Sequence, residues 1–213
     1  MEIRPHDLLA FEHMNDLLFG ETPPGWVKGS VAKTPYVVVR RAPITNNCVP
    51  VGMRGTERSH RLKALLPLDK IKARYSPEYI TKHRLWHEVD KKRLELPVLK
   101  GLDAMDRIFS GEGLSWGVTG SAGFELVTGI HTVSISSDLD VIVRTNHMML
   151  ETAMYLYEEF QRLPFRVDVH MEGQAGAFAL NEYVQNTGKI LLRTKQGPQL
   201  VFDPWKQEEK AVL

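Results

Sequence analysis

Two short motifs in the C-terminal half of the chain combine residue types that suit chemistry at a phosphate. Gly120-Ser121 comes first, and Gly120 lies eighteen positions before the pair Asp138 and Asp140 (138 − 120 = 18). A Gly-Ser pair that opens a helix offers backbone N–H groups and a hydroxyl to an anion. Two carboxylates this close repel each other unless a cation joins them, and Mg²⁺ or Mn²⁺ accepts oxygen ligands. Together the motifs indicate a phosphate cradle facing a metal site, which is typical of nucleotidyl transfer.

A third carboxylate completes the predicted metal site. In a strand, residues i and i+2 point to the same face, so Asp138 and Asp140 project together. Asp168 lies in a later segment of β type, where a carboxylate on a buried face needs a charged partner. We therefore predict that the three aspartates are catalytic and hold the metal. The alternative for Asp168 is a salt bridge with Arg166 or Arg193.

Arginines gather in the N-terminal third of the chain and are candidates for binding substrate. Arg40 and Arg41 follow a β-branched run at 36–39. Arg54 stands between glycines in a segment, 49–55, that is predicted as a loop, and Arg58 and Arg61 lie three positions apart. Glycines beside a basic residue suit a close approach to an anion. The predicted substrate-binding residues are therefore Gly120 and Ser121 together with Arg40, Arg41, Arg54, Arg58 and Arg61. For the arginines the alternative is a solvated basic surface.

The elements that must position these residues follow from periodicity and punctuation. Strands are predicted at 36–39, 116–119, 139–144 and 165–170, and helices at 6–19, 102–110, 122–127, 148–163 and 178–185, with 190–194 either a short strand or a helix end. The C-terminal half thus alternates strands and helices. We predict an α+β protein with a mixed sheet and helices in residues 77–213, preceded by a smaller α/β domain in residues 1–76.

Composition narrows the functional classes. The formal net charge is +1, which does not indicate a nucleic-acid partner, although residues 54–100 carry 13 Lys and Arg against 6 Asp and Glu. The only cysteine, Cys48, excludes an internal disulfide and suits a reducing cytoplasm. The N-terminus has no basic-then-apolar signal pattern, and no apolar run approaches the roughly 18 residues that span a bilayer. We expect a cytoplasmic protein without a membrane partner.

The motifs resemble a known family. Residues 120–126 and 137–140 (GSAGFEL and SDLD) are similar to the nucleotidyltransferase fold, and more narrowly to the malonate decarboxylase holo-acyl-carrier-protein synthases, also called phosphoribosyl-dephospho-CoA transferases. Segments of the N-terminal half resemble the same family at 4–9 (RPHDLL), 37–42 (VVVRRA) and 50–55 (PVGMRG). The spacer between Gly-Ser and Asp-x-Asp is longer than in many nucleotidyltransferases, which favours this subfamily.

The resemblance implies a reaction and two partners. The donor would be 2′-(5″-triphosphoribosyl)-3′-dephospho-CoA, and the acceptor a serine of the apo acyl carrier subunit of malonate decarboxylase. A phosphodiester would form and pyrophosphate would leave. Mg²⁺ or Mn²⁺ would be held by Asp138 and Asp140, while Gly120 and Ser121 would hold the β- and γ-phosphates.

Two other functions fit the same residues. One is a different metal-dependent nucleotidyltransferase, either the related citrate lyase holo-carrier synthase or an enzyme that uses ATP or CTP. The other is a non-catalytic binding module that kept the fold and lost its affinity for metal. The intact set Asp138, Asp140 and Asp168 argues against that loss.

Overall fold

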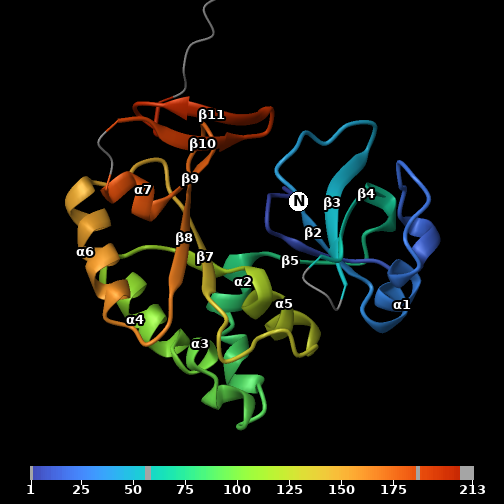
Figure 1. Cartoon of the computed structure of the whole chain (residues 1–213), viewed down its shortest axis with the longest axis horizontal. Coiled ribbons are helices and arrows are strands. Elements are labelled where there is room, and N and C mark those ends of the chain that lie inside the picture. The colour runs from blue at the N-terminus through green and yellow to red at the C-terminus, as the bar shows by residue number, and fades with distance from the viewer. Residues whose placement is uncertain (1, 56–58, 186–187, 207–213) are drawn as a thin grey trace, which may run out of the picture. The chain divides into compact units, whose positions relative to one another are not determined.

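The computed structural model describes residues 2–55, 59–185 and 188–206. The chain divides into two compact units, Met1–Ser76 and Pro77–Leu213. Each unit builds its own sheet (Figure 1) and its own cluster of buried apolar side chains. The predicted mixed architecture, with a smaller N-terminal part, is confirmed.

The N-terminal unit is an antiparallel sheet with the strand order β4-β3-β2-β1-β5. Its core contains Leu9, Val37, Val51 and Leu66, and the helix α1 contributes Val27 to it. The elements are β1 (Leu8–Ala10), α1 (Trp26–Lys33), β2 (Tyr36–Val39), β3 (Cys48–Arg54), β4 (Arg61–Pro67) and β5 (Ala73–Tyr75), with 3₁₀ turns at Met14–Asp16 and Leu68–Lys70.

The C-terminal unit is a mixed sheet with the strand order β11-β10-β9-β8-β7-β6. Only β7 and β8 run parallel among its paired strands, and α6 connects them. The strands are β6 (Trp116–Val118), β7 (Leu139–Arg144), β8 (Val167–Glu172), β9 (Ala177–Ala179), β10 (Ile190–Thr194) and β11 (Gly197–Val201). The helices are α2 (Pro77–Lys82), α3 (Pro97–Lys100), α4 (Leu102–Gly111), α5 (Gly120–Thr128), α6 (Leu150–Gln161) and α7 (Leu180–Val184), with 3₁₀ turns at Leu85–Glu88 and Arg93–Glu95.

Helices support the two parallel strands through the larger core. In Figure 1, α4 and α6 lie together beside β8, and their contact includes Phe109 and Phe160, whose ring centroids are 5.4 Å apart. Leu139, Val141 and Val143 of β7 are fully buried in the same cluster. Because alternate residues of a strand face opposite sides, this burial turns Asp140 to the other face. The apolar pattern of β7 thus fixes the direction of its carboxylate.

Two sequence predictions of local structure are wrong, and a third is wrong in part. The segment 6–19, predicted as a helix, contains β1, a three-residue strand that pairs with β2 on one side and β5 on the other and whose residues are all buried. The segment 49–55, predicted as a loop, is mostly β3, which pairs with β4 over seven residues. In addition, the predicted helix 178–185 begins as β9 and becomes helical only at Leu180. A short apolar run does not distinguish a buried strand from a helix.

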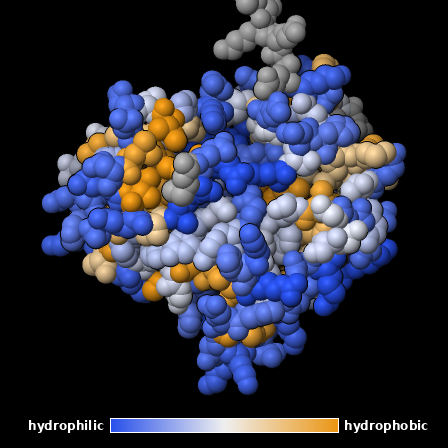
Figure 2. Space-filling model, turned by 180° about the vertical axis from the view of Figure 1, so that it is seen from behind, coloured by the Kyte–Doolittle hydropathy of each residue, from blue (hydrophilic) through white to orange (hydrophobic). Residues whose placement is uncertain are grey.

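The surface is mainly hydrophilic on the face drawn in Figure 2, with small separate hydrophobic patches. Large apolar side chains that are exposed include Ile135, Met149, Leu200 and Phe202. Single exposed apolar residues are normal for a folded chain. Among the helices formed by the described residues, none has the length and apolar character needed to cross a bilayer.

Candidate active site

The parallel pairing of β7 with β8 brings two predicted carboxylates side by side. Asp140 and Asp168 are register partners, and the pairing continues in step from Leu139 opposite Val167. Directly opposite residues on neighbouring strands point to the same face of a sheet. Asp138 precedes β7, has no regular structure and is exposed. The two strand carboxylates are therefore neighbours, and the third stands at the entrance to the same strand.

The N-terminus of α5 lies directly against Asp140. Gly120, the first residue of this helix, has φ +60°, and a Cβ placed on it would lie 1.9 Å from Oδ2 of Asp140. The N–H of Thr119 donates to the backbone carbonyl of Asp140 at 2.9 Å. Only a glycine permits both this positive φ and this approach. Gly120 and the carboxylate, predicted as parts of one site, are thus brought together.

Ser121 follows at the beginning of the helix and is partly buried. Thr119 occupies the position before α5, and its side chain makes no capping hydrogen bond to the helix. The first N–H groups of a helix have no partner within it and carry partial positive charge. The start of α5 therefore favours an anion beside Asp140.

One guanidinium lies among the carboxylates. Nη2 of Arg166 donates to Oδ1 of Asp168 at 3.0 Å. This hydrogen bond raises the pKa of Arg166, and the negative charges of Asp168, Asp138 and Asp140 raise it further. The charges of all three aspartates thus converge on one exposed cation, and the salt bridge considered as the alternative for Asp168 is present. Within the described parts of the chain, no three His, Cys, Asp or Glu residues are arranged to hold a metal ion as they stand.

A buried ion pair fixes the long spacer between the two motifs. Glu125 of α5 is 3% exposed and forms two 2.8 Å hydrogen bonds with Arg93. Its Oε2 also accepts from the backbone N–H groups of Thr132 and Val133, at 2.7 and 2.8 Å. The hydroxyl of Thr132 donates to the carbonyl of Ser121 at 2.8 Å. The chain is therefore tied to α5 just before it enters Asp138 and β7.

Sequence reasoning missed this role of Glu125 and Arg93. Glu125 stood inside the family-like motif at 120–126, but its burial depends on how α5 packs, which no spacing shows. Glutamate is rarely buried unless it is paired. A partner 32 residues away in the chain gives no local signal.

The predicted arginines of the N-terminal unit separate into two groups. Arg40 and Arg41 follow β2, where the N–H of Arg40 donates to the carbonyl of Pro50 near the beginning of β3. Arg54 is exposed at the other end of β3, directly opposite the exposed Arg61 at the start of β4. The sheet thus pairs Arg54 with Arg61, whereas the backbone of Arg40 lies opposite Pro50 and its side chain runs over Gly52. Arg58 lies outside the described residues.

Family models match both units. The one described as phosphoribosyl-dephospho-CoA transferase MdcG N-terminal domain matches residues 4–77, and the one described as the MdcG C-terminal domain matches residues 84–204. No solved structure matches the chain significantly.

Curated relatives extend over nearly the whole chain. A phosphoribosyl-dephospho-CoA transferase of Pseudomonas fluorescens (strain Pf0-1) is 38% identical, with 92% of this chain and 96% of the relative covered. Relatives with the same name from Pseudomonas putida and Azotobacter vinelandii (strain DJ / ATCC BAA-1303) are each 35% identical. They cover 98% and 96% of this chain, and 98% and 95% of their own lengths.

The fold and the site define a two-unit α/β protein whose C-terminal sheet gathers carboxylates at the start of a helix. With both units matched, the chain belongs to the phosphoribosyl-dephospho-CoA transferase family. The resemblance of the motifs at 120–126 and 137–140 to the phosphoribosyl-dephospho-CoA transferase family is thereby confirmed.

Proposed function

We propose that this protein transfers the phosphoribosyl-dephospho-CoA group from 2′-(5″-triphosphoribosyl)-3′-dephospho-CoA to a serine of the apo acyl carrier subunit of malonate decarboxylase. The transferase activity is supported by the family and by relatives with the same name. The structural observation that carries the proposal is the contact of Gly120 with Asp140, which itself lies beside Asp168. This contact sets the start of a helix, where phosphate binds, against a pair of carboxylates.

For the carboxylates we propose a divalent cation, Mg²⁺ or Mn²⁺, which would have to draw the three side chains closer together than they stand in the structure. Asp138, Asp140 and Asp168 supply oxygen ligands, and their charges already converge on the cation of Arg166. When bound, such an ion neutralises phosphate charge and lowers the pKa of a hydroxyl. Arg166 would then share Asp168 with the ion or release it, because one carboxylate oxygen faces the guanidinium.

The residues of this chain position the donor. The free N–H groups at Gly120 and Ser121 hold the β- and γ-phosphates, and the positive end of α5 stabilises their charge. In the other unit, Arg40, Arg41, Arg54 and Arg61 are proposed to bind phosphates or the carrier protein. Transfer of this kind depends mainly on positioning and on electrostatic stabilisation of the transition state.

The proposed reaction is one displacement at phosphorus. The serine oxygen forms a bond with the α-phosphorus of the donor, and the bond from that phosphorus to the bridging oxygen of the β-phosphate breaks. Pyrophosphate leaves with the bonding electrons, and the hydroxyl proton passes to a base, for which we propose Asp168. The products are a phosphodiester on the carrier and free pyrophosphate.

The direct test incubates the protein with the triphosphoribosyl donor, Mg²⁺ and apo carrier subunit, and then measures the intact mass of the carrier. We expect a mass gain equal to the donor less pyrophosphate, and none with a carrier whose acceptor serine is replaced by alanine. The apo carrier of citrate lyase, in a parallel reaction, measures acceptor preference. A carrier of unchanged mass in the complete reaction would refute the proposed function.

The carboxylates are tested by substitution. Asp138→Ala and Asp140→Ala should each abolish transfer while circular dichroism and thermal unfolding stay close to wild type. Asp69→Ala, which removes an exposed carboxylate from the other unit, is the control and should remain active. Near-normal activity in either site variant would remove the metal hypothesis.

A further inference from the structure

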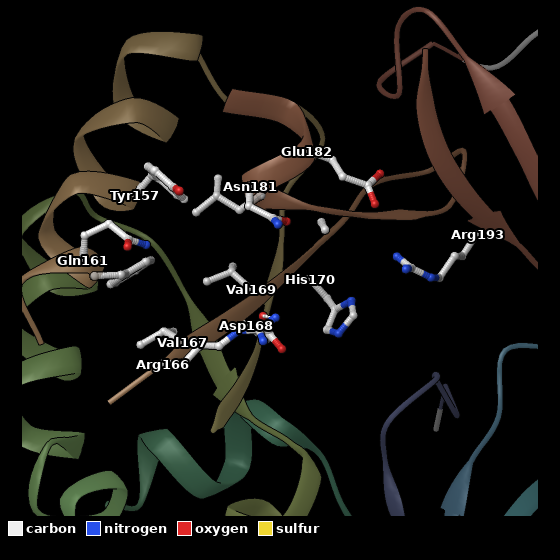
Figure 3. Close-up of a pocket in the computed structure, with 13 residues that line it drawn as sticks. Tyr157, Gln161, Arg166, Val167, Asp168, Val169, His170, Asn181, Glu182 and Arg193 are labelled. Atoms are coloured by element: carbon white, nitrogen blue, oxygen red, sulfur yellow. Dashed lines mark hydrogen bonds and ion pairs between the residues drawn. The ribbon is translucent and has the colours of Figure 1, made fainter. Parts of the chain in front are cut away.

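A second feature of the C-terminal unit lies beside the aspartates. A pocket of about 240 Å³ opens next to β8 and is lined by side chains of α6, β8, α7 and β10. Figure 3 shows Asp168 and His170 on β8, with Asn181 and Glu182 of α7 and Arg193 of β10 around the same space. The pocket therefore shares Asp168 with the candidate active site.

The topology of the sheet explains why a pocket forms here. β9 pairs with β8 only from His170 onward, where His170 stands opposite Ala179. The chain then turns into α7 at Leu180, so β9 does not cover the first half of β8. The uncovered half contains Val167, Asp168 and Val169, all of which line the pocket. The ending of β9 thus leaves one side of Asp168 accessible.

The carboxylates that line the pocket have hydrogen-bond partners, but one nitrogen of the Arg193 guanidinium has none among the described residues. Asp168 is paired with Arg166 at 3.0 Å, and Oε2 of Glu182 accepts from the N–H of Leu191 at 3.2 Å. Nη1 of Arg193 is buried, and no described residue accepts a hydrogen bond from it. In Figure 3 the guanidinium of Arg193 points into the pocket. A buried donor without an acceptor is costly, and a charged one more so.

We propose that this pocket is a subsite for a phosphate group of the donor, with Arg193 as the residue that binds it. Guanidinium matches phosphate oxygens in a two-bond geometry, and such charge-assisted hydrogen bonds are strong. The side-chain amide of Asn181 supplies a further donor at the pocket wall. The inference rests on the proposed function, because that function supplies a ligand rich in phosphate. The phosphate comes either from the triphosphate or from the diphosphate of the dephospho-CoA part.

The test measures binding to the full chain by isothermal titration calorimetry with three probes. Dephospho-CoA carries the diphosphate, inorganic triphosphate carries the other phosphate source, and adenosine carries neither. Arg193→Met removes the charge and keeps an unbranched side chain, while Arg193→Lys keeps the charge and loses the fork. Lys195→Met, in the same hairpin but not among the lining residues, is the matched control for a loss of one positive charge.

We expect Arg193→Met to raise the Kd of one phosphate probe by about ten- to a hundredfold, as for loss of a charged hydrogen bond. The probe that responds identifies which phosphate occupies the pocket. Arg193→Lys should give a smaller increase, and the affinity for adenosine and the behaviour of Lys195→Met should not change. If Arg193→Met fails to fold, the comparison of Arg193→Lys with Lys195→Met decides the matter.

Other outcomes overturn the proposal. These are wild-type protein that binds neither phosphate probe, Arg193 variants that bind both with wild-type affinity, and an equal loss for adenosine. Failure here is separable from failure of the proposed function. If the carrier still gains mass while the Arg193 variants bind normally, the subsite is wrong and the reaction stands. If the probes respond but the carrier gains no mass, the subsite stands and the reaction is wrong.

Discussion

Gly120→Ala is the substitution for which the structure gives the clearest expectation. The Cβ of alanine would lie 1.9 Å from Oδ2 of Asp140 and 2.7 Å from its Cγ. Ordinary contact for a Cβ begins at 3.4 Å, so Oδ2 must retreat by about 1.5 Å (3.4 − 1.9). The Cβ of Asp140 is also too close, at 2.9 Å, so rotation of the carboxylate is not enough and the backbone of Asp140 or of α5 must shift as well.

Two costs combine in this variant and can be separated. The φ of +60° is unfavourable for alanine by roughly 1–2 kcal/mol, which is a loss of stability. The displaced carboxylate is a loss of catalytic geometry, and misplacement by about 1 Å costs on the order of a hundredfold in rate. Gly129→Ala is the matched control, because Gly129 ends the same helix with φ +71° and nothing lies within 4 Å of its Cβ position.

The assay pairs urea unfolding with the rate of carrier modification. Gly129→Ala should lose about 1–2 kcal/mol of unfolding free energy, and Gly120→Ala should lose at least as much, because it adds the clash with Asp140. Only Gly120→Ala should lose about a hundredfold or more in kcat, at a temperature where both variants are folded. A Gly120→Ala rate within threefold of wild type, or an equal loss of kcat in Gly129→Ala, would refute the reasoning.

Three further predictions follow from other contacts. Glu125→Gln removes the negative charge from a buried pair and should lower the free energy of unfolding by about 3 kcal/mol, because Arg93 loses its charged partner and keeps only neutral acceptors such as the carbonyl of Val133. An unchanged urea midpoint would contradict this. Arg54→Ala should raise the Kd or KM for donor or carrier without lowering the melting temperature, because Arg54 stands opposite Arg61 and two like charges do not stabilise a strand pair. Unchanged kinetic constants would show that Arg54 is only a solvated surface residue. Asp140→Ala should weaken the binding of Mn²⁺ measured by electron paramagnetic resonance, and wild-type affinity would exclude Asp140 as a ligand.

The sequence predicts secondary structure best where a run of β-branched or aliphatic residues has clear ends. The strands 36–39 and 139–144 were predicted with the bounds that the structure has, because each is a β-branched or aliphatic run. The prediction of a helix near 122–127, ended at Gly129, is also confirmed, with Gly129 in the left-handed conformation. The strand 139–144 bears Asp140 and the helix α5 begins at Gly120, so the local setting of these two residues could be foreseen.

Pairing between distant strands could not be foreseen in the same way. That Asp140 stands opposite Asp168 depends on the register of β7 with β8, and one step of register would have moved Asp168 to the other face. The strand β11 is not predicted from the sequence, because its glycine, proline and glutamine are not typical of strands. An edge strand such as β11 tolerates these residues. Arg193 was considered only as a partner of Asp168, and its place in the pocket depends on where β9 ends.

The anchoring of the spacer bears on how this family can vary in length. Thr132 and Val133 are bound to Glu125, which fixes the chain against α5 before it reaches Asp138. The next four residues, 134–137, form a mainly exposed turn, in which the N–H of Ser134 donates a hydrogen bond to the hydroxyl of Ser137. An insertion there would extend into solvent and leave both ends in place. Over evolution, homologues are therefore free to gain or lose residues in this turn, and a motif search with a fixed Gly-Ser to Asp-x-Asp distance would overlook them.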